Sequence, residues 1–136
     1  MNKPDMTMAQ QIAQAASAYE KQRSGHVPKS LTVVLSADTL VVTLRGTLSP
    51  AEMVLARSPA GAAEMQELHR QLFAASVGSL RQEITRITGA KVLDSRVNME
   101  TMTGGIMQLF ATGTIVQVFL LDQKVPQTSW SGSDPG

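Results

Sequence analysis

The segment that most constrains the fold is a long amphipathic stretch from about Ala60 to Thr88. Apolar residues recur in it at the spacing of one helix face, while Glu, Arg and Gln side chains occupy the opposite face. A helix of this length does not bury its apolar face alone, so the rest of the chain has to supply a surface for it. The predicted inner face consists of Met65, Leu68, Leu72, Ser76, Leu80, Ile84 and Ile87, widened by Phe73 and Val77.

Two short runs rich in β-branched residues, 30–36 (SLTVVLS) and 39–45 (TLVVTLR), provide such a surface. The short connection around Ala37 and Asp38 predicts an antiparallel hairpin. Alternate positions are Leu or Val throughout each run, as in strands with one buried face: Leu31, Val33 and Leu35, then Leu40, Val42 and Leu44. The opposite face, with Thr32, Val34, Thr43 and Arg45, is expected to be partly solvated.

Two further helices are marked by their ends. The spacing of apolar residues predicts an amphipathic helix from about Thr7 to Arg23, which Gly25 would end in a left-handed conformation. A second helix begins after Ser49, because Pro50 suits its first position and Glu52 can complete a capping box with Ser49. This box explains Glu52 better than acid–base chemistry does.

The last third of the chain is again strand-like. One strand is predicted over Lys91–Met99 and another over Thr114–Leu121, with a tight turn at Gly104-Gly105. The apolar patch Ile106–Phe110 would extend the last strand backwards, with Gly113 as a bulge. The predicted fold class is therefore α+β: a two-layer sandwich in the order α-β-β-α-α-β-β. Its four-stranded, mostly antiparallel sheet comes from two hairpins, and the long helix and the first helix cover one face.

The second face of that sheet has no predicted cover. Its many apolar or small residues indicate a homodimer, with sheet packed against sheet. We expect one domain over residues 7–125 and a flexible polar tail over 126–136, because QTSWSGSDPG buries too little surface to order itself. Trp130, the only tryptophan, lies in this tail. It is interpreted as a dangling residue, with an anchor on a partner or a second subunit as the alternative.

Composition and charge exclude several classes of function. Twelve Lys and Arg residues against eleven Asp and Glu give a net charge of +1, a poor fit to a nucleic-acid binder. With no cysteine and two histidines, His26 and His69, disulfide, zinc-ribbon and iron–sulfur sites are excluded. We therefore expect no cofactor and no metal. Without a signal-peptide run or an apolar stretch that could span a bilayer, a soluble, cytoplasmic protein is expected.

Candidate chemical groups are few. No nucleophile–base pair and no phosphate-binding loop is recognisable, so an enzyme is the least favoured class. Arg45 follows a strand close to the start of the Pro50 helix and would suit an anion. With His69 and Arg70 it forms the candidate anion or ligand contact. The competing interpretation is a solvated charge for Arg45 and a surface cluster with Glu64 for the other two.

The sequence resembles a small bacterial family, the MpsC-like domain, whose name refers to a Na+-translocating, membrane-potential-generating system. The resemblance runs from about Thr7 to Asp122 and is most specific over Leu44–Glu52 (LRGTLSPAE), followed by Leu55-Ala56. Weaker support comes from Thr88–Val92 and Val118–Asp122. Relative to the family pattern, about nine residues near Gly105–Gly113 look inserted before the last strand.

The resemblance implies a non-enzymatic accessory or regulatory domain without established catalytic residues. Such a domain would act through protein–protein contacts, with a membrane ion-transport system as a candidate partner and without entering the membrane itself. The alternative is a small-ligand or anion-binding module at a dimer interface, with Arg45, His69 and Arg70 as recognition groups.

Overall fold

The structure, a computed structural model, describes residues 6–93, 105–110 and 112–131. Its elements alternate between helices and antiparallel strands in the predicted α+β class. In chain order they are α1 (Met8–Ser24), β1 (Ser30–Ser36), β2 (Thr39–Arg45), α2 (Pro50–Leu55), α3 (Pro59–Thr88), β3 (Gly105–Leu109), β4 (Ile115–Leu120) and α4 (Gln127–Ser131).

The strands form one antiparallel sheet in the order β1-β2-β4-β3. The first hairpin has the predicted bounds, with Ser36 paired to Thr39 across the two-residue turn. Ala37 takes a φ of 57° in this turn, the left-handed conformation that so short a hairpin connection requires. Because β2 also pairs with β4, the two hairpins join into a single layer, as the sequence predicts.

The second hairpin is built from different residues than predicted. Its first strand is β3, Gly105–Leu109, and the chain turns between Phe110 and Thr114. The prediction of a turn at Gly104-Gly105 is therefore wrong, and the apparent insertion near Gly105–Gly113 is this strand and its turn. Of the predicted strand Lys91–Met99, residues 91–93 bond to the end of β4 through a Val92–Leu121 bridge. Residues 94–99 lie outside the described part.

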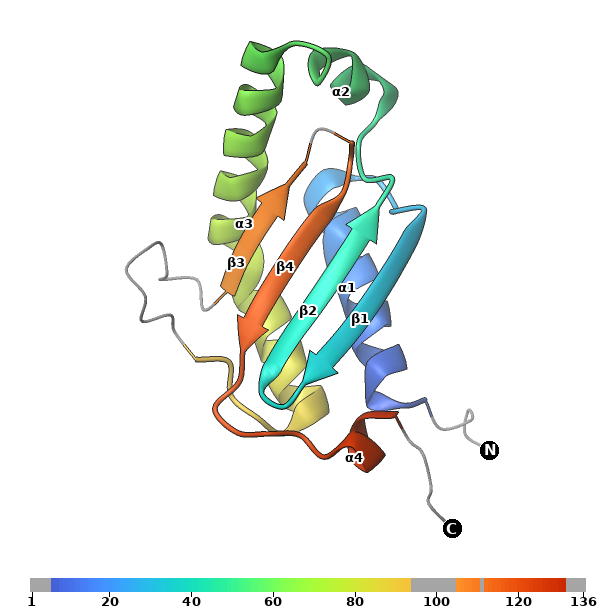
Figure 1. Cartoon of the computed structure of the whole chain (residues 1–136), viewed down its shortest axis with the longest axis vertical. Helices are drawn as coiled ribbons and strands as arrows, with labels where there is room; N and C mark the ends of the chain where they lie inside the picture. Colours follow the sequence, from blue (N-terminus) through green and yellow to red (C-terminus); the bar gives the residue numbers. More distant parts are fainter. Residues whose placement is uncertain (1–5, 94–104, 111, 132–136) are drawn as a thin grey trace.

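Helices α1 and α3 cover one face of the sheet, and the sheet lies in front of them in Figure 1. The core between the layers is filled from both sides, with Phe73 of α3 against Phe119 of β4 and edge-on to Tyr19 of α1. The predicted inner face of α3 is wrong in detail: Leu68 is 51% exposed, whereas His69 is buried. Because α3 packs on α1 as well as on the sheet, its buried face is rotated toward His69 and Phe73.

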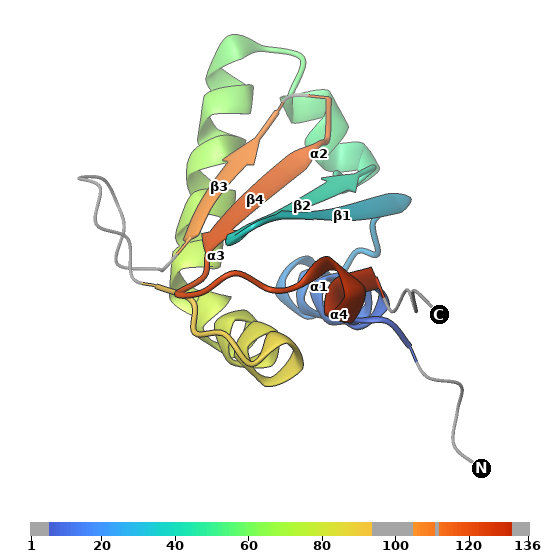
Figure 2. The same ribbon diagram turned by 60° about the horizontal axis from the view of Figure 1, so that its bottom comes forward.

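The tail prediction is wrong for residues 127–131. They form α4, which packs against α1 (Figure 2), and Trp130 is 6% exposed within its own chain. Gln127 Nε2 also donates to the carbonyl of Leu35 at 3.4 Å, which ties α4 to the edge strand β1. A single large aromatic side chain thus supplies the apolar area that the polar tail composition lacks.

The other face of the sheet, here called the open face, has no helix over it among the described elements (Figures 1 and 2). Val34, Val41 and Val118 form a row across three neighbouring strands. Thr, Ser, Val and Leu side chains surround this row, and Val34 and Leu120 are 57% and 43% exposed. Arg45, at the end of β2, is the one charged residue that the described strands place on this face.

Candidate functional site

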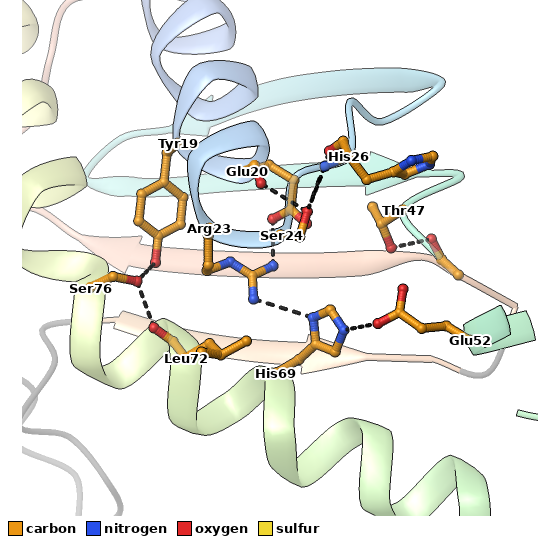
Figure 3. A network of polar contacts seen from close by, with 11 residues as sticks. Tyr19, Glu20, Arg23, Ser24, His26, Thr47, Glu52, His69, Leu72 and Ser76 are labelled. Carbon is orange, nitrogen blue, oxygen red and sulfur yellow. Dashed lines mark hydrogen bonds and ion pairs between the residues drawn. The ribbon is translucent and has the colours of Figure 1, made fainter. Parts of the chain in front are cut away.

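The most unusual feature of the interior is a chain of polar side chains that joins three helices. It runs from Glu20 and Arg23 on α1, through His69 on α3, to Glu52 on α2 (Figure 3). We call these four residues the polar chain. Its members lie between the helices and the sheet, and only the Glu52 end reaches solvent.

At the inner end, Glu20 and Arg23 form an ion pair one helical turn apart. Arg23 Nη2 donates to Glu20 Oε1 at 2.5 Å, and the two side chains are 2% and 0% exposed. Arg23 also lies over the ring of Tyr19, with its guanidinium carbon 5.9 Å from the ring centroid. Both charges have been removed from water, so each depends on its partner to compensate for lost hydration.

The middle of the polar chain fixes the tautomer of His69. Arg23 Nη1 lies 3.2 Å from His69 Nδ1. Because a guanidinium only donates, Nδ1 has to accept, and this assigns the ring hydrogen to Nε2. Nε2 then donates to Glu52 Oε2 at 3.0 Å. His69 is therefore a neutral bridge between a cation and an anion, and both of its nitrogens are occupied.

At the outer end, Glu52 has two functions. Its Oε1 accepts the N–H of Ser49 at 2.9 Å and so completes the predicted capping box, while Oε2 accepts from His69. Desolvation favours the neutral carboxyl, but the hydrogen bonds from Ser49 and His69 outweigh it and hold the pKa of Glu52 below its usual range. The carboxylate of Glu52 thus caps the N-terminus of α2 and also links α2 to α3 through His69.

Several polar atoms in and near the polar chain have no hydrogen-bond partner among the described residues. They are Glu20 Oε2, Arg23 Nε and both amide atoms of Gln117, whose side chain is 0% exposed. Gln117 precedes Phe119 by two residues on the covered face of β4, and His69 precedes Phe73 by one turn of α3. Because α3 and β4 run in the same direction (Figure 1) and Phe73 meets Phe119, Gln117 lies at the level of His69. Buried polar groups are thus concentrated in one layer of the core.

The polar chain joins α1, α3 and α2 through the contacts of His69 with Arg23 and Glu52. In residues 6–93, 105–110 and 112–131, no group of three His, Asp or Glu side chains is placed to hold a metal ion. No helix among these residues is long and apolar enough to cross a membrane.

The predicted contact residues do not meet. His69 faces the core, whereas Arg70 is exposed and pairs with Glu67 at 2.5 Å. Arg45 points from the end of β2 toward the open face. The surface cluster of Glu64, His69 and Arg70 is also wrong for His69, because that side chain is 1% exposed.

The sequence interpretation missed Glu20 and Arg23. A signal for them exists: positions 12, 16 and 19 define the buried face of α1, and positions 20 and 23 continue that face. A Glu and an Arg one turn apart on an apolar face indicate a buried pair. The hydrophobic periodicity of a helix does not reveal such residues, because charged side chains are expected on its solvent-facing side.

Comparison with known proteins identifies relatives of this chain. Residues 5–123 match the family model described as Na+-translocating membrane potential-generating system (MpsC). The chain is also similar to the uncharacterized protein YbcI of Bacillus subtilis (strain 168), with 26% identity over 110 residues, or 81% of this chain and 89% of the Bacillus protein. No solved structure matches.

Proposed function

Since the chain belongs to the MpsC family, we propose that it is a non-enzymatic accessory domain that acts through protein–protein contacts. The open face of its sheet would be the contact surface, and a second copy of the chain would be its first occupant. The family description names an ion-translocating membrane system, and we propose that the dimer regulates or assists such a system.

One observation carries this proposal: the open face carries a row of valines, and the described strands place a single charged residue, Arg45, on it. Strands of this length and number make a face of roughly 20 by 19 Å, at about 3.3 Å per residue and about 4.8 Å between strands. Monomeric proteins usually cover or charge such a surface. Two such faces would pack about 10 Å apart, with their valine rows interdigitated.

The polar chain supports a non-enzymatic role. Both nitrogens of His69 and both carboxylate oxygens of Glu52 are already bonded within the protein. A general acid or base has to reach a substrate proton, and His69 is 1% exposed. The groups with the most suggestive chemistry are therefore committed to joining the helices.

The ligand-binding alternative has less support. It needs Arg45, His69 and Arg70 to converge on one site, and these side chains point in three directions. Thermal-shift measurements with phosphate and bicarbonate test this alternative. A rise in the melting temperature of the wild type that is lost in Arg45→Ala would support it.

Sedimentation velocity tests the main proposal. The wild-type chain is expected to sediment as a dimer, and Val41→Lys, at the centre of the valine row, as a monomer with an unchanged circular dichroism spectrum. Val34→Lys serves as a second variant, because Val34 is 57% exposed and tolerates a lysine without loss of core packing. Ala75→Lys, on the exposed side of α3, is the matched control and should remain dimeric. A monomeric wild type would contradict the proposal.

A further inference from the structure

One end of the molecule gathers exposed apolar side chains outside the open face. These are Val27 (52% exposed), Met53 (57%), Val54 (59%), Leu55 (51%) and Phe110 (46%). They come from the connection between α1 and β1, from α2, and from the β3–β4 turn, which lie together at the top of Figure 1. We call these five residues the apolar end. None of the six residues of α2 is buried, so this helix contributes its large side chains to the surface instead of the core.

We propose that the apolar end docks reversibly on the surface of an anionic lipid bilayer. This inference does not rest on the proposed function, because its apolar residues differ from those of the open face; Arg45, at the end of β2, is a residue that both surfaces share. It rests on three properties of this end: exposed apolar side chains, a rigid support and a basic surround.

Hydrogen bonds between neighbouring loops make the end rigid. His26 Nε2 lies 3.1 Å from the carbonyl of Gly46, and the N–H of Lys29 donates to the carbonyl of Arg45 at 2.8 Å. Thr47 donates from both its N–H and its hydroxyl to the carbonyl of Gly113, which holds the β3–β4 turn beside the start of α2. The apolar side chains are thus presented by a fixed platform, and little ordering is needed when they bind.

Basic residues surround the apolar end. Lys29, Arg45 and Arg57 are exposed there, at the start of β1, the end of β2 and the end of α2. Glu52, the acidic residue within α2, turns its carboxylate inward to Ser49 and His69. These three basic residues border the apolar side chains, although the whole chain carries only +1.

The position of these side chains favours a bilayer as the partner. They come from a short helix and two connections at one end of the molecule (Figure 1), so they can enter a flat surface together. Shallow insertion of a few aliphatic and aromatic side chains, assisted by basic residues, is typical of reversible binding to anionic lipid.

Vesicle co-sedimentation tests the inference. The wild-type chain is expected to pellet with vesicles of phosphatidylcholine and phosphatidylglycerol, and not with phosphatidylcholine alone. Val54→Ser/Leu55→Ser should abolish pelleting. Arg45→Gln/Arg57→Gln should weaken binding about thirtyfold, which is the effect of removing two basic residues near an anionic surface.

Two matched controls separate this test from the test of the proposed function. Val34→Ser/Leu120→Ser removes exposed apolar side chains from the open face and should still pellet, whatever its oligomeric state. Lys91→Gln/Lys124→Gln removes the same charge at the other end of the molecule and should bind like the wild type. The inference is overturned if the wild type pellets with neither vesicle, or if the α2 variant pellets as well as the wild type. Equal binding to both vesicle types would overturn the role of the basic residues.

Discussion

Each face of the sheet has exceptions to the usual assignment of polar and apolar groups. Behind the covered face lie a glutamate, an arginine, a histidine and a glutamine that are almost fully buried. On the open face, valines that any core could accommodate face outward in a row. The buried polar residues hold the helices in a defined arrangement. The valines of the open face leave apolar surface exposed to water. The two faces thus differ in where their exceptions lie, and the proposed function assigns contact to the open face.

The largest effect is expected from breaking the buried ion pair. Arg23→Ala leaves Glu20 as an uncompensated buried carboxylate and removes a donor to His69. We expect a loss of about 3–5 kcal/mol in the free energy of unfolding, measured by urea denaturation. Arg70→Ala is the matched control, since Arg70 pairs with Glu67 at the same i,i+3 spacing but with side chains 56% and 49% exposed. Arg70→Ala should lower the free energy of unfolding by no more than about 1 kcal/mol. Equal losses in the two variants would contradict the difference between the buried and the exposed ion pair.

The same substitution on the two faces sharpens the comparison. Val42 is 1% exposed on the covered face, and Val34 is 57% exposed on the open face. Val42→Thr buries a hydroxyl and is expected to cost about 1–3 kcal/mol. Val34→Thr should change the free energy of unfolding of the monomer by less than about 0.5 kcal/mol. A large cost at Val34 in a monomeric sample would mean that the open face is covered in a way the structure does not contain.

Gln117 offers a test in the stabilising direction. Its amide is buried without a hydrogen-bond partner, and methionine has a similar shape without the polar atoms. Gln117→Met should therefore raise the free energy of unfolding by about 1 kcal/mol. A decrease in the free energy of unfolding would instead mean that the Gln117 amide forms a hydrogen bond that stabilises the core.

The smallest expected effect is a pH dependence of Glu52. Its pKa is lowered in the folded protein, so its contribution to stability is present above the pKa of the unfolded chain. That contribution is lost as the pH falls through the lower folded pKa. Glu52→Gln retains an oxygen for the capping box but removes the charge, so wild type and variant should differ at neutral pH and converge at strongly acidic pH.

Local rules predicted much of the fold correctly. The hairpin 30–36/39–45 and the Ser49–Glu52 capping box appear with the predicted residues, because short-range geometry determines both. The long helix and the joined sheet also followed from periodicity and turn length. The strand Gly105–Leu109 was not predicted as a separate strand, because its place in the sheet depends on pairing with β4, which no local pattern specifies.

The candidate site was less predictable for a physical reason. The described helices contain three Glu–Arg ion pairs at i,i+3 spacing: Glu20–Arg23, Glu67–Arg70 and Glu83–Arg86. Of these three, the first is buried and the other two are exposed. Its burial depends on how α1 packs against α3 and the sheet, which no local pattern specifies. His69 was misassigned for the same reason, because a rotation of α3 by one position exchanges it with Leu68.

Site-specific cross-linking tests the central claim, contact through the open face, most directly. The chain has no cysteine, so Val41→Cys and Ala75→Cys each introduce a single thiol, the first at the centre of the open face and the second on the outer side of α3. With a short bismaleimide, Val41→Cys is expected to give a covalent dimer at micromolar protein, and Ala75→Cys almost none. Equal cross-linking of the two variants, or none from Val41→Cys, would contradict this claim.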